Sequence, residues 1–311
     1  MSAPNPPSDA AEPQLRAVMG ERRNLLNVGY RLLGSLVEAE DVVQEAYTRW
    51  YTMTPQERAE IRNPGAWLTT VTSRICLNLL TSARVRRETY VGDWLPEPLP
   101  GPGGTDNAAP DDTAADPADR VTLDESVGMA LMVVMESMTP AERVAFILHD
   151  VFGFPFDEIA EIVGRSPGAC RQLASSARGR VRAARPDSTA PAPAQQADVV
   201  RRFETAWRSK DIDSLVTLLD PSVVATADGG GRALAFRDPI EGRDHVIDVW
   251  LQLADRIGEL TLHQRSVNGQ PGLVAQQDGR TVSVYAFDIV DGLIRRIWAI
   301  RNPEKLRPWT V

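Results

Sequence analysis

Two stretches of the sequence are unsuited to a packed core, and they divide the chain into parts. Residues 91–120 and 186–197 are rich in Pro, Gly, Ala and polar residues, and the apolar periodicity of the flanking segments stops at each. Such compositions are typical of flexible connections. Residues 1–13 are Pro- and Ala-rich and are predicted to be disordered. A chain of 311 residues is long enough for several cores. The predicted domains are residues 14–90, 121–185 and 198–311.

The charge of the chain is segregated along the sequence. The formal net charge is −8, which by itself is unlike that of a nucleic-acid-binding protein. However, seven acids and no base lie between Asp93 and Asp119, whereas six arginines and no acid lie between Arg165 and Arg185. Local charge is therefore a better guide to function than the total.

No apolar run of the sequence approaches the length of a membrane span, and residues 1–12 lack a basic region followed by an apolar one. We therefore expect a cytoplasmic protein. Cys76 and Cys170 are the only cysteines, and each falls in a helical pattern. They are interpreted as core residues in a reducing compartment, so that neither a disulfide nor a metal site is expected.

The first domain is predicted to be all-helical. Apolar residues at steps of three and four predict a helix that ends at Gly34, and Ser35 with Glu38 forms a capping box before a second helix over residues 37–51. A third helix, over residues 63–87, has an apolar side and a polar, arginine-bearing side with Trp67 at the boundary. Arginines neutralise phosphates and an aromatic ring stacks on an unpaired base, so this helix suits a nucleic-acid strand. An ordinary amphipathic helix with a solvated basic face is the alternative.

The second domain ends in a helix-turn-helix pattern. Helices are predicted over residues 124–138, 140–153, 156–163 and 167–184. Between the last two, Gly164 and Arg165 form a turn, Ser166 is the cap and Pro167 occupies the first helical position. An arginine-rich second helix after such a turn is typical of a helix that enters the major groove. Two stacked helices with a basic face are the alternative.

The third domain changes pattern. Helices are predicted over residues 199–209, 212–219 and 243–257, and strands over 223–226, 260–267, 273–277, 281–289 and 293–300. The Asp-Gly pairs at residues 278–279 and 291–292 predict hairpin turns. Helices followed by an antiparallel meander predict an α+β fold.

One part of the first linker stands apart from the rest. Residues 94–99 read Trp-Leu-Pro-Glu-Pro-Leu, which places a Trp and two leucines in a segment held extended by prolines. Such a segment suits a docking peptide. A loop that packs on its own domain is equally consistent with it.

These elements, in this order and spacing, resemble the extracytoplasmic-function (ECF) sigma factors of bacterial RNA polymerase over residues 15–184. The resemblance implies two all-α sigma domains, the second with a helix-turn-helix, which bind core RNA polymerase (its beta-prime and beta subunits) and promoter DNA. The implied polymerase-binding residues are Glu40, Asp41, Gln44 and Glu45. The implied promoter-melting residues are Asn63, Trp67, Arg74, Asn78, Arg84, Arg86 and Arg87. The implied upstream-element residues are Ser166, Ala169, Arg171, Gln172, Ser175 and Arg178.

The remaining motifs resemble those of the subgroup with a C-terminal SnoaL-like extension, the sigma factor J type. Its three signatures correspond here to an interdomain regulatory set: Trp94, Leu95, Pro96, Glu97 and Pro98; Asp228, Gly229, Gly230, Gly231 and Arg232; Asn302, Pro303, Glu304, Lys305 and Leu306. Arg232 and Glu304 are conservative departures from the usual Lys and Asp of the subgroup. The resemblance implies an NTF2-like cone with an apolar pocket in the C-terminal domain.

The sequence thus predicts a sigma factor whose C-terminal domain modulates its activity in cis, with residues 302–306 packed near residues 94–98. No catalytic residue and no cofactor is expected. The alternatives are a stand-alone helix-turn-helix regulator and a cyclase- or isomerase-like enzyme, in which Asp228, Asp238, His245, His263 and Trp298 would line the pocket. The identity of any small-molecule ligand of that pocket is left open.

Overall fold

The structure is a computed structural model of the whole chain, and it describes residues 18–87, 90–101, 128–184, 192–256 and 260–309. These residues form two compact units, each of which is described by itself. The first unit contains residues up to Ala83 together with Met138–Arg178. The second contains the segments from Arg84 and from Thr122, and all residues from Gly179 on.

The first unit is helical. Its N-terminal helices are α2 (Arg22–Leu33), α3 (Leu36–Thr52), α4 (Pro55–Glu60) and α5 (Pro64–Arg87). Its later helices are α7 (Pro140–Phe146), the π-helical turn η2 (Ile147–Val151), α8 (Phe156–Val163) and α9 (Pro167–Ala184). The last residues of α5 and α9 belong to the second unit.

Local capping explains where most of these helices begin and end. Thr139 and Glu142 form a complete capping box with Pro140 at the first helical position, as predicted. The same arrangement of Thr54, Pro55 and Glu57 starts α4, a helix that the sequence analysis missed. At the other end of α2 and α8, Gly34 (φ 73°) and Gly164 (φ 70°) adopt the left-handed conformation that terminates a helix.

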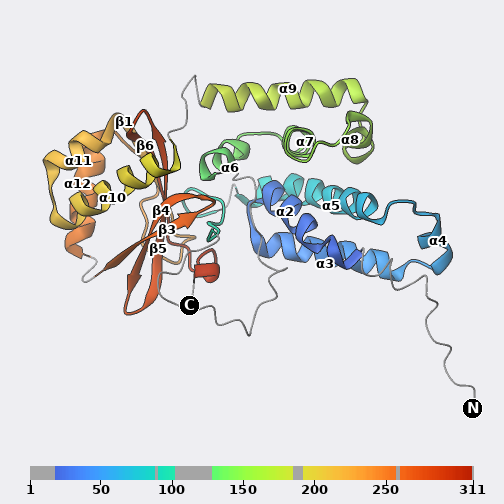
Figure 1. Cartoon of the computed structure of the whole chain (residues 1–311), viewed down its shortest axis with the longest axis horizontal. Helices are drawn as coiled ribbons and strands as arrows, with labels where there is room; N and C mark the ends of the chain where they lie inside the picture. Colours follow the sequence, from blue (N-terminus) through green and yellow to red (C-terminus); the bar gives the residue numbers. More distant parts are fainter. Residues whose placement is uncertain (1–17, 88–89, 102–127, 185–191, 257–259, 310–311) are drawn as a thin grey trace, which may run out of the picture. The chain divides into compact units, whose positions relative to one another are not determined.

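The second unit is built on a mixed six-stranded sheet (Figure 1). Its strands are β1 (Leu219–Asp228), β2 (Ile240–Glu241), β3 (Thr261–Val267), β4 (Gln270–Gln277), β5 (Arg280–Val290) and β6 (Leu293–Ile300). The spatial order is β2-β1-β6-β5-β4-β3, and all neighbours are antiparallel except β1 and β6. The predicted hairpins at Asp278-Gly279 and Asp291-Gly292 are present, with positive φ at all four residues.

The two faces of this sheet are covered differently. Three helices, α10 (Pro193–Ser209), α11 (Ile212–Leu218) and α12 (Arg243–Arg256), form one core with it. The buried aromatic residues of this core are Phe203, Trp207, Trp250, Tyr285 and Phe287. The other face carries helix α6 (Met129–Glu136) and Leu95, which share a second core with Trp298 and Ile300.

The predicted fold class, two helical regions followed by an α+β domain, is confirmed. Some details differ: α10 begins at Pro193, inside the predicted linker 186–197, and the short strand β2, like helix α4, was not predicted. Helix α6 belongs to the compact unit that contains the sheet, although the sequence analysis assigned it to the second helical domain. The domain boundaries themselves stay a prediction. Within the described residues, no helix is long and apolar enough to cross a membrane.

The aromatic core on α10 predicts a large stability effect at Phe203. Phe203 is 1% exposed, and its ring contacts those of Trp207 and Phe287. Phe203→Ala should lower the free energy of unfolding of this unit by about 3–5 kcal/mol, because a cavity replaces the ring. Thr205→Ala, at an exposed position of the same helix, is the control and should change it by less than about 0.5 kcal/mol. Urea denaturation followed by tryptophan fluorescence measures both, and similar midpoints would contradict this account.

Candidate functional site: nucleic-acid and polymerase interfaces and the interdomain cluster

The predicted polymerase-binding residues lie on the exposed face of α3. Glu40, Asp41, Gln44 and Glu45 are exposed, whereas Val42, Val43 and Ala46 on the opposite side are buried. Ser35 fixes the start of the helix, since its hydroxyl accepts a hydrogen bond from the Glu38 amide at 3.4 Å. Glu45 forms an ion pair with Arg49, one turn further along the helix, at 2.9 Å. The face is therefore acidic and open to solvent.

Helix α5 carries the predicted promoter-melting residues, and their settings differ. The side chain of Asn63 caps the helix by accepting a hydrogen bond from the Ala66 amide at 3.1 Å. Trp67 is half-buried, with its ring centroid 5.3 Å from that of Trp50 on α3. Arg74 and Asn78 are exposed, and Arg74 donates a hydrogen bond to the backbone oxygen of Glu161 at 2.9 Å.

The apolar side predicted for α5, formed by Leu68, Val71, Ile75 and Leu79, is only partly right. Leu68 and Val71 are buried, but Ile75 and Leu79 are half-buried. The buried side of α5 includes Thr72 and Cys76 instead of Ile75 and Leu79. The side chains of Arg84, Arg86 and Arg87 lie outside the described residues.

The helix-turn-helix consists of α8, the turn at Gly164 and Arg165, and α9. The Ser166 hydroxyl caps α9 by accepting a hydrogen bond from the Ala169 amide at 3.2 Å. Arg171, Gln172 and Ser175 are exposed, while Ala169 and Arg178 are half-buried. Arg178 forms a 2.7 Å ion pair with Asp150, so one of the predicted upstream-element residues already has a carboxylate partner.

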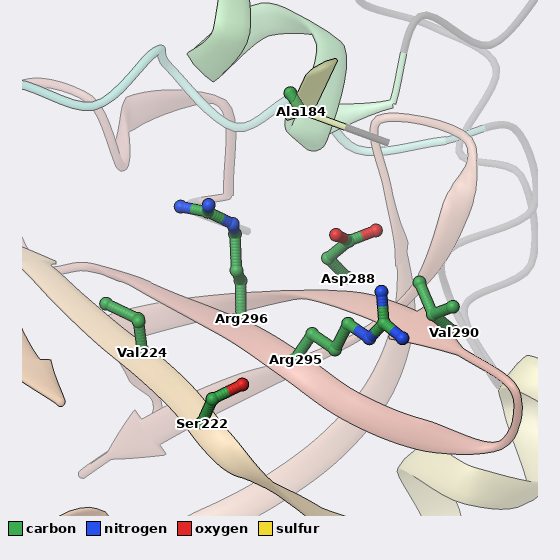
Figure 2. Close-up of a pocket in the computed structure, with 7 residues that line it drawn as sticks. All are labelled: Ala184, Ser222, Val224, Asp288, Val290, Arg295 and Arg296. Atoms are coloured by element: carbon green, nitrogen blue, oxygen red, sulfur yellow. The ribbon is translucent and has the colours of Figure 1, made fainter. Parts of the chain in front are cut away.

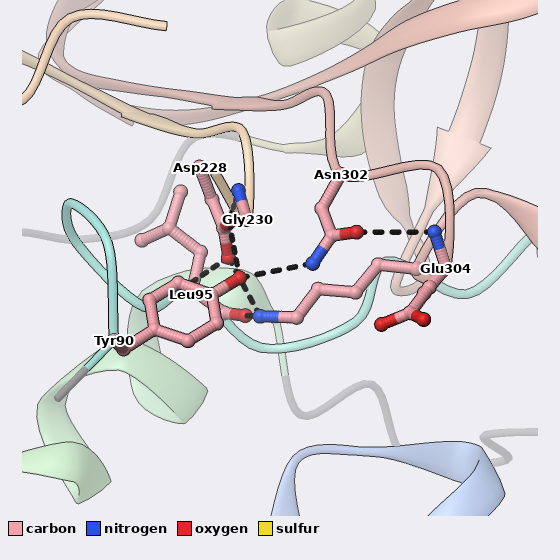
Figure 3. A network of polar contacts seen from close by, with 7 residues as sticks. Tyr90, Leu95, Asp228, Gly230, Asn302 and Glu304 are labelled. Atoms are coloured by element: carbon pink, nitrogen blue, oxygen red, sulfur yellow. Dashed lines mark hydrogen bonds and ion pairs between the residues drawn. The ribbon is translucent and has the colours of Figure 1, made fainter. Parts of the chain in front are cut away.

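The three signature segments meet at the carboxylate of Asp228 (Figure 3). Asp228 is 1% exposed at the end of β1. Its Oδ1 accepts hydrogen bonds from the hydroxyl of Tyr90 at 2.7 Å and the amide of Gly230 at 3.0 Å. Its Oδ2 accepts from the amide of Leu95 at 3.0 Å and pairs with the ammonium of Lys305 at 2.6 Å. A buried charge is thus satisfied by four donors from separate parts of the chain.

The ammonium of Lys305 is enclosed by the linker segment. It donates a second hydrogen bond to the backbone oxygen of Leu95, and it lies 4.1 Å from the ring centroid of Trp94 and 5.4 Å from that of Tyr90. Rings at this distance attract a cation. Burial, followed by the hydrogen bond to the Asp228 carboxylate, raises the pKa of the Tyr90 hydroxyl, which therefore stays a donor at neutral pH.

The glycine run serves a turn and a close approach of side chains. Gly230 and Gly231 have φ values of 61° and 70°, which L side chains rarely adopt. A Cβ on Gly230 would collide with the side-chain amide of Asn302, and that amide donates a hydrogen bond to the Tyr90 hydroxyl at 2.9 Å. Of the two departures from the subgroup pattern, Arg232 and Glu304 form an exposed ion pair at 2.9 Å.

The linker segment continues along the sheet beyond this cluster. Asn268, at the β3–β4 turn, accepts a hydrogen bond from the Leu99 amide at 3.0 Å and donates one to the Leu99 oxygen at 2.8 Å. The indole of Trp309 donates to the Pro98 oxygen at 2.8 Å. Leu95 and Leu306 are buried in the same core. Pro96, Glu97 and Pro98 are buried as well. Pro303 is exposed.

Sequence reasoning missed three residues of this cluster: Tyr90, Asn268 and Trp309. Tyr90 lies next to a Val-Gly pair at the edge of the acidic linker, and Trp309 is an aromatic residue close to the C-terminus. Asn268-Gly269 is itself a hairpin signal that was overlooked. The positions of Tyr90 and Trp309 carry no local pattern, because their partners are distant in sequence.

The residues of the enzyme alternative are not gathered in one pocket. The carboxylate of Asp228 is paired with the ammonium of Lys305. Trp298 lies in the core on the other face of the sheet from the core that contains α10, α11 and α12. Asp238 and His245 are exposed. A cavity of about 140 Å³ lies elsewhere, over β1, β5 and β6 (Figure 2). It is lined by Ala184, Ser222, Val224, Asp288, Val290, Arg295 and Arg296. Among the described residues, no group of His, Cys, Asp and Glu is placed to hold a metal ion.

Comparison with known proteins agrees with this arrangement. Residues 18–86 match the family model of sigma-70 region 2, and residues 128–181 match that of sigma-70 region 4. The chain is 41% identical to the ECF RNA polymerase sigma factor SigJ of Mycobacterium tuberculosis, over 91% of this chain and 90% of that protein. It is 34% identical to a probable ECF sigma factor, SigI, of the same species, over 96% of each. The crystal structure of SigJ superposes with a TM-score of 0.71, at 38% identity, covering 93% of this chain and 96% of that one.

The helical regions, with their helix-turn-helix and acidic α3 face, therefore define a sigma factor that directs transcription initiation. More narrowly, the chain belongs to the ECF RNA polymerase sigma factor family, in the form that carries a SnoaL-like, NTF2-like domain after region 4. The predicted family and function are confirmed. Sigma regions 2 and 4 imply binding of core RNA polymerase and promoter DNA.

The buried ion pair predicts a strong dependence on Lys305. Lys305→Met leaves the Asp228 carboxylate buried without its cation and should lower the free energy of unfolding by about 3–5 kcal/mol. The double variant Asp228→Asn/Lys305→Met should lose less than this, because the uncompensated charge is gone. Arg232→Met breaks the exposed pair with Glu304 and should cost less than about 1 kcal/mol. Chemical denaturation measures all three, and equal effects of Lys305→Met and Arg232→Met would contradict the assignment.

Proposed function

We propose that the C-terminal domain of this sigma factor holds both ends of the segment that joins regions 2 and 4, and thereby controls how the two regions engage a promoter. One observation carries the proposal. Leu95, shortly after region 2, and Met129 and Ala130, at the start of region 4, are buried in one core with Trp298 and Ile300 of the sheet.

At the region 2 end, residues 90–101 are held by polar contacts along their length. The Asp228 carboxylate accepts a hydrogen bond from the Leu95 amide. Asn268 binds both the amide and the backbone oxygen of Leu99, and the Gly101 amide donates to the backbone oxygen of Ser266 at 3.0 Å. A buried backbone that loses water must regain each hydrogen bond, so this segment has a specific register on the sheet.

At the region 4 end, helix α6 contributes apolar surface. Met129 and Ala130 are buried and Val133 packs against the same core. Gly128 lies close to the side chain of Gln270. A Cβ added at Gly128 would lie 2.8 Å from the side-chain nitrogen of Gln270. Two DNA-reading regions on a tether gain affinity through their effective concentration, and a tether fixed at both ends limits the distances that they sample. The C-terminal domain therefore favours one spacing of promoter elements.

Within this proposal the predicted site residues have the following roles. The exposed acidic face of α3 docks on basic surfaces of the polymerase, for which the beta-prime and beta subunits are the expected contacts. Trp67, Arg74 and Asn78 on α5 bind a non-template base that has left the duplex, which favours the open promoter. Arg171 and Gln172 on α9 suit guanine and adenine edges in the major groove. The protein acts in the cytoplasm, and a small-molecule ligand of the C-terminal domain remains unidentified.

The polymerase contact is tested at Asp41. Asp41→Arg reverses the charge at the centre of the exposed α3 face and should weaken binding to core polymerase by a factor of about 10 or more. Asp248→Arg makes the same change at an exposed position of α12 and is the control. Binding is measured by fluorescence anisotropy with purified core enzyme. Equal affinities for the two variants would contradict this role, and footprinting of duplex promoter without polymerase would instead favour a stand-alone regulator.

The control of spacing is tested by run-off transcription from promoters whose two elements are moved apart or together by one and two base pairs. The full-length chain should prefer one spacing, and Lys305→Met should reduce that preference by about fivefold or more. A chain that ends before Pro193 should reduce it further, whereas Arg232→Met should keep it. If the truncated chain shows the full preference, the C-terminal domain does not set the spacing.

A further inference from the structure

The helix-turn-helix of region 4 is preceded by the π-helical turn η2 (Ile147–Val151). In it, the Phe152 amide donates a hydrogen bond to the backbone oxygen of Ile147 at 3.2 Å, five residues back. Such a turn holds one residue more than a turn of α-helix, and turns of this kind are frequent at functional sites. Gly153 follows in the left-handed conformation, with a φ of 72°, and α8 then begins at Phe156. The turn and the start of α8 are therefore only a few residues apart.

The ring of His149 in η2 is held by two contacts. Its Nδ1 lies 2.9 Å from the backbone oxygen of Phe154. A carbonyl oxygen only accepts hydrogen bonds, so Nδ1 carries a proton and donates this one. The ring also stacks on that of Phe156, with 3.9 Å between the centroids and 29° between the planes. Phe156, the first residue of α8, thus lies against a side chain whose orientation is already fixed.

Phe156 in turn contacts the DNA-facing helix. The central carbon of the Arg171 guanidinium, on α9, lies 5.5 Å from the centroid of the Phe156 ring, a distance at which a ring attracts a cation. Arg171 is exposed, so the ring restrains this side chain without enclosing it. An Arg side chain has many rotamers, and excluding most of them in advance reduces the entropy that a contact with DNA would cost.

A second arginine of α9 is held by the next residue of the same turn. The Oδ1 of Asp150 lies 2.7 Å from the Nε of Arg178. Arg178 follows Arg171 by about two helical turns, so the two arginines lie on the same side of α9. Consecutive residues of η2, His149 and Asp150, therefore support both arginines, one through the ring of Phe156 and the other directly.

We infer that Phe156, stacked on His149, is a positioning residue for promoter recognition: it directs the Arg171 guanidinium and thereby sets the base preference at the position of the upstream element that Arg171 reads. The inference rests on the proposed role of Arg171 in the major groove. Arg binds the O6 and N7 of guanine through two hydrogen bonds, and this contact depends on the direction of its planar fork.

A positioning role and a packing role of Phe156 have different consequences. Contacts with phosphates carry no sequence information, so a misdirected Arg171 keeps its attraction to DNA and loses discrimination at one base pair. If Phe156 only packed α8 on its neighbours, its loss would weaken binding to all promoter sequences alike.

The experiment measures base preference at each position of the upstream element. The full-length chain is assembled with core polymerase, and its affinity for promoter fragments that differ at one base pair at a time is measured by fluorescence anisotropy. Arg171→Ala identifies the base pair that Arg171 reads. Phe156→Leu should reduce the preference at that base pair by about fivefold or more and change the preference elsewhere by less than about twofold.

Three further variants are the controls. Phe156→Tyr keeps an aromatic ring and should keep the preference. Phe154→Leu makes the same change at a position where a backbone oxygen binds His149, and it should keep the preference too. In a chain that already carries Arg171→Ala, Phe156→Leu should reduce the preference at that base pair no further, because the side chain that it directs is gone.

An unchanged preference in Phe156→Leu, or an equal loss of affinity for every fragment, overturns the inference. If Phe156→Leu lowers the helical content measured by circular dichroism, Phe156→Met replaces it. The contact itself is measured in the free chain by NMR: the Nε–H resonance of Arg171 should shift when Phe156→Leu removes the ring, and an unshifted resonance also overturns the inference. If the resonance shifts but Arg171→Ala leaves every preference unchanged, it is the proposed role of Arg171 in reading DNA that fails, and the inference fails with it.

Discussion

The buried carboxylate of Asp228 is the interaction on which the organisation of the second unit depends. It is satisfied only when the linker, the glycine turn and the C-terminal segment all supply donors: Tyr90 and Leu95, Gly230, and Lys305. An ionised carboxylate that lost any of these inside the protein would be costly. The three segments are therefore stable together or not at all. This explains why a docking peptide in the linker occurs in the same chain as a glycine run and a Lys-bearing tail.

This dependence gives one face of the sheet a structural role within its own chain. The face covered by α10, α11 and α12 is filled by aromatic side chains, including Phe203, Trp207 and Trp250. The opposite face binds other parts of the same chain, namely Leu95 and helix α6. A sheet edge and face that take up peptide segments use the same backbone hydrogen bonding as peptide recognition between proteins. The C-terminal domain thus binds part of its own linker.

Local sequence signals predicted most of the elements, because their causes lie within a few residues. The box Thr139–Glu142, the Pro167 start and the Asp-Gly hairpins fix helices and turns without help from the rest of the fold. The partners of Asp228 and of Arg143 could not be predicted in this way. The contacts of Asp228 with Tyr90 and Leu95, and of Arg143 with Leu32, join residues more than 100 positions apart, and they form because a buried charge without a partner is costly. The same limit applies to α6, whose apolar surface indicated burial but not the sheet that buries it.

The two sets of buried charges differ in how readily they are released. Asp228 and Lys305 are opposite charges, and each is also bound by neutral partners, so separating them exposes two unsatisfied ions at once. The hydrogen bond from Arg143 to the Leu32 oxygen joins a cation to a neutral group, and such a bond by itself contributes about 1.5–3 kcal/mol. The Asp228 carboxylate also accepts the hydrogen bonds of Tyr90, Leu95 and Gly230, so the linker segment is held on the second unit by several contacts that break together.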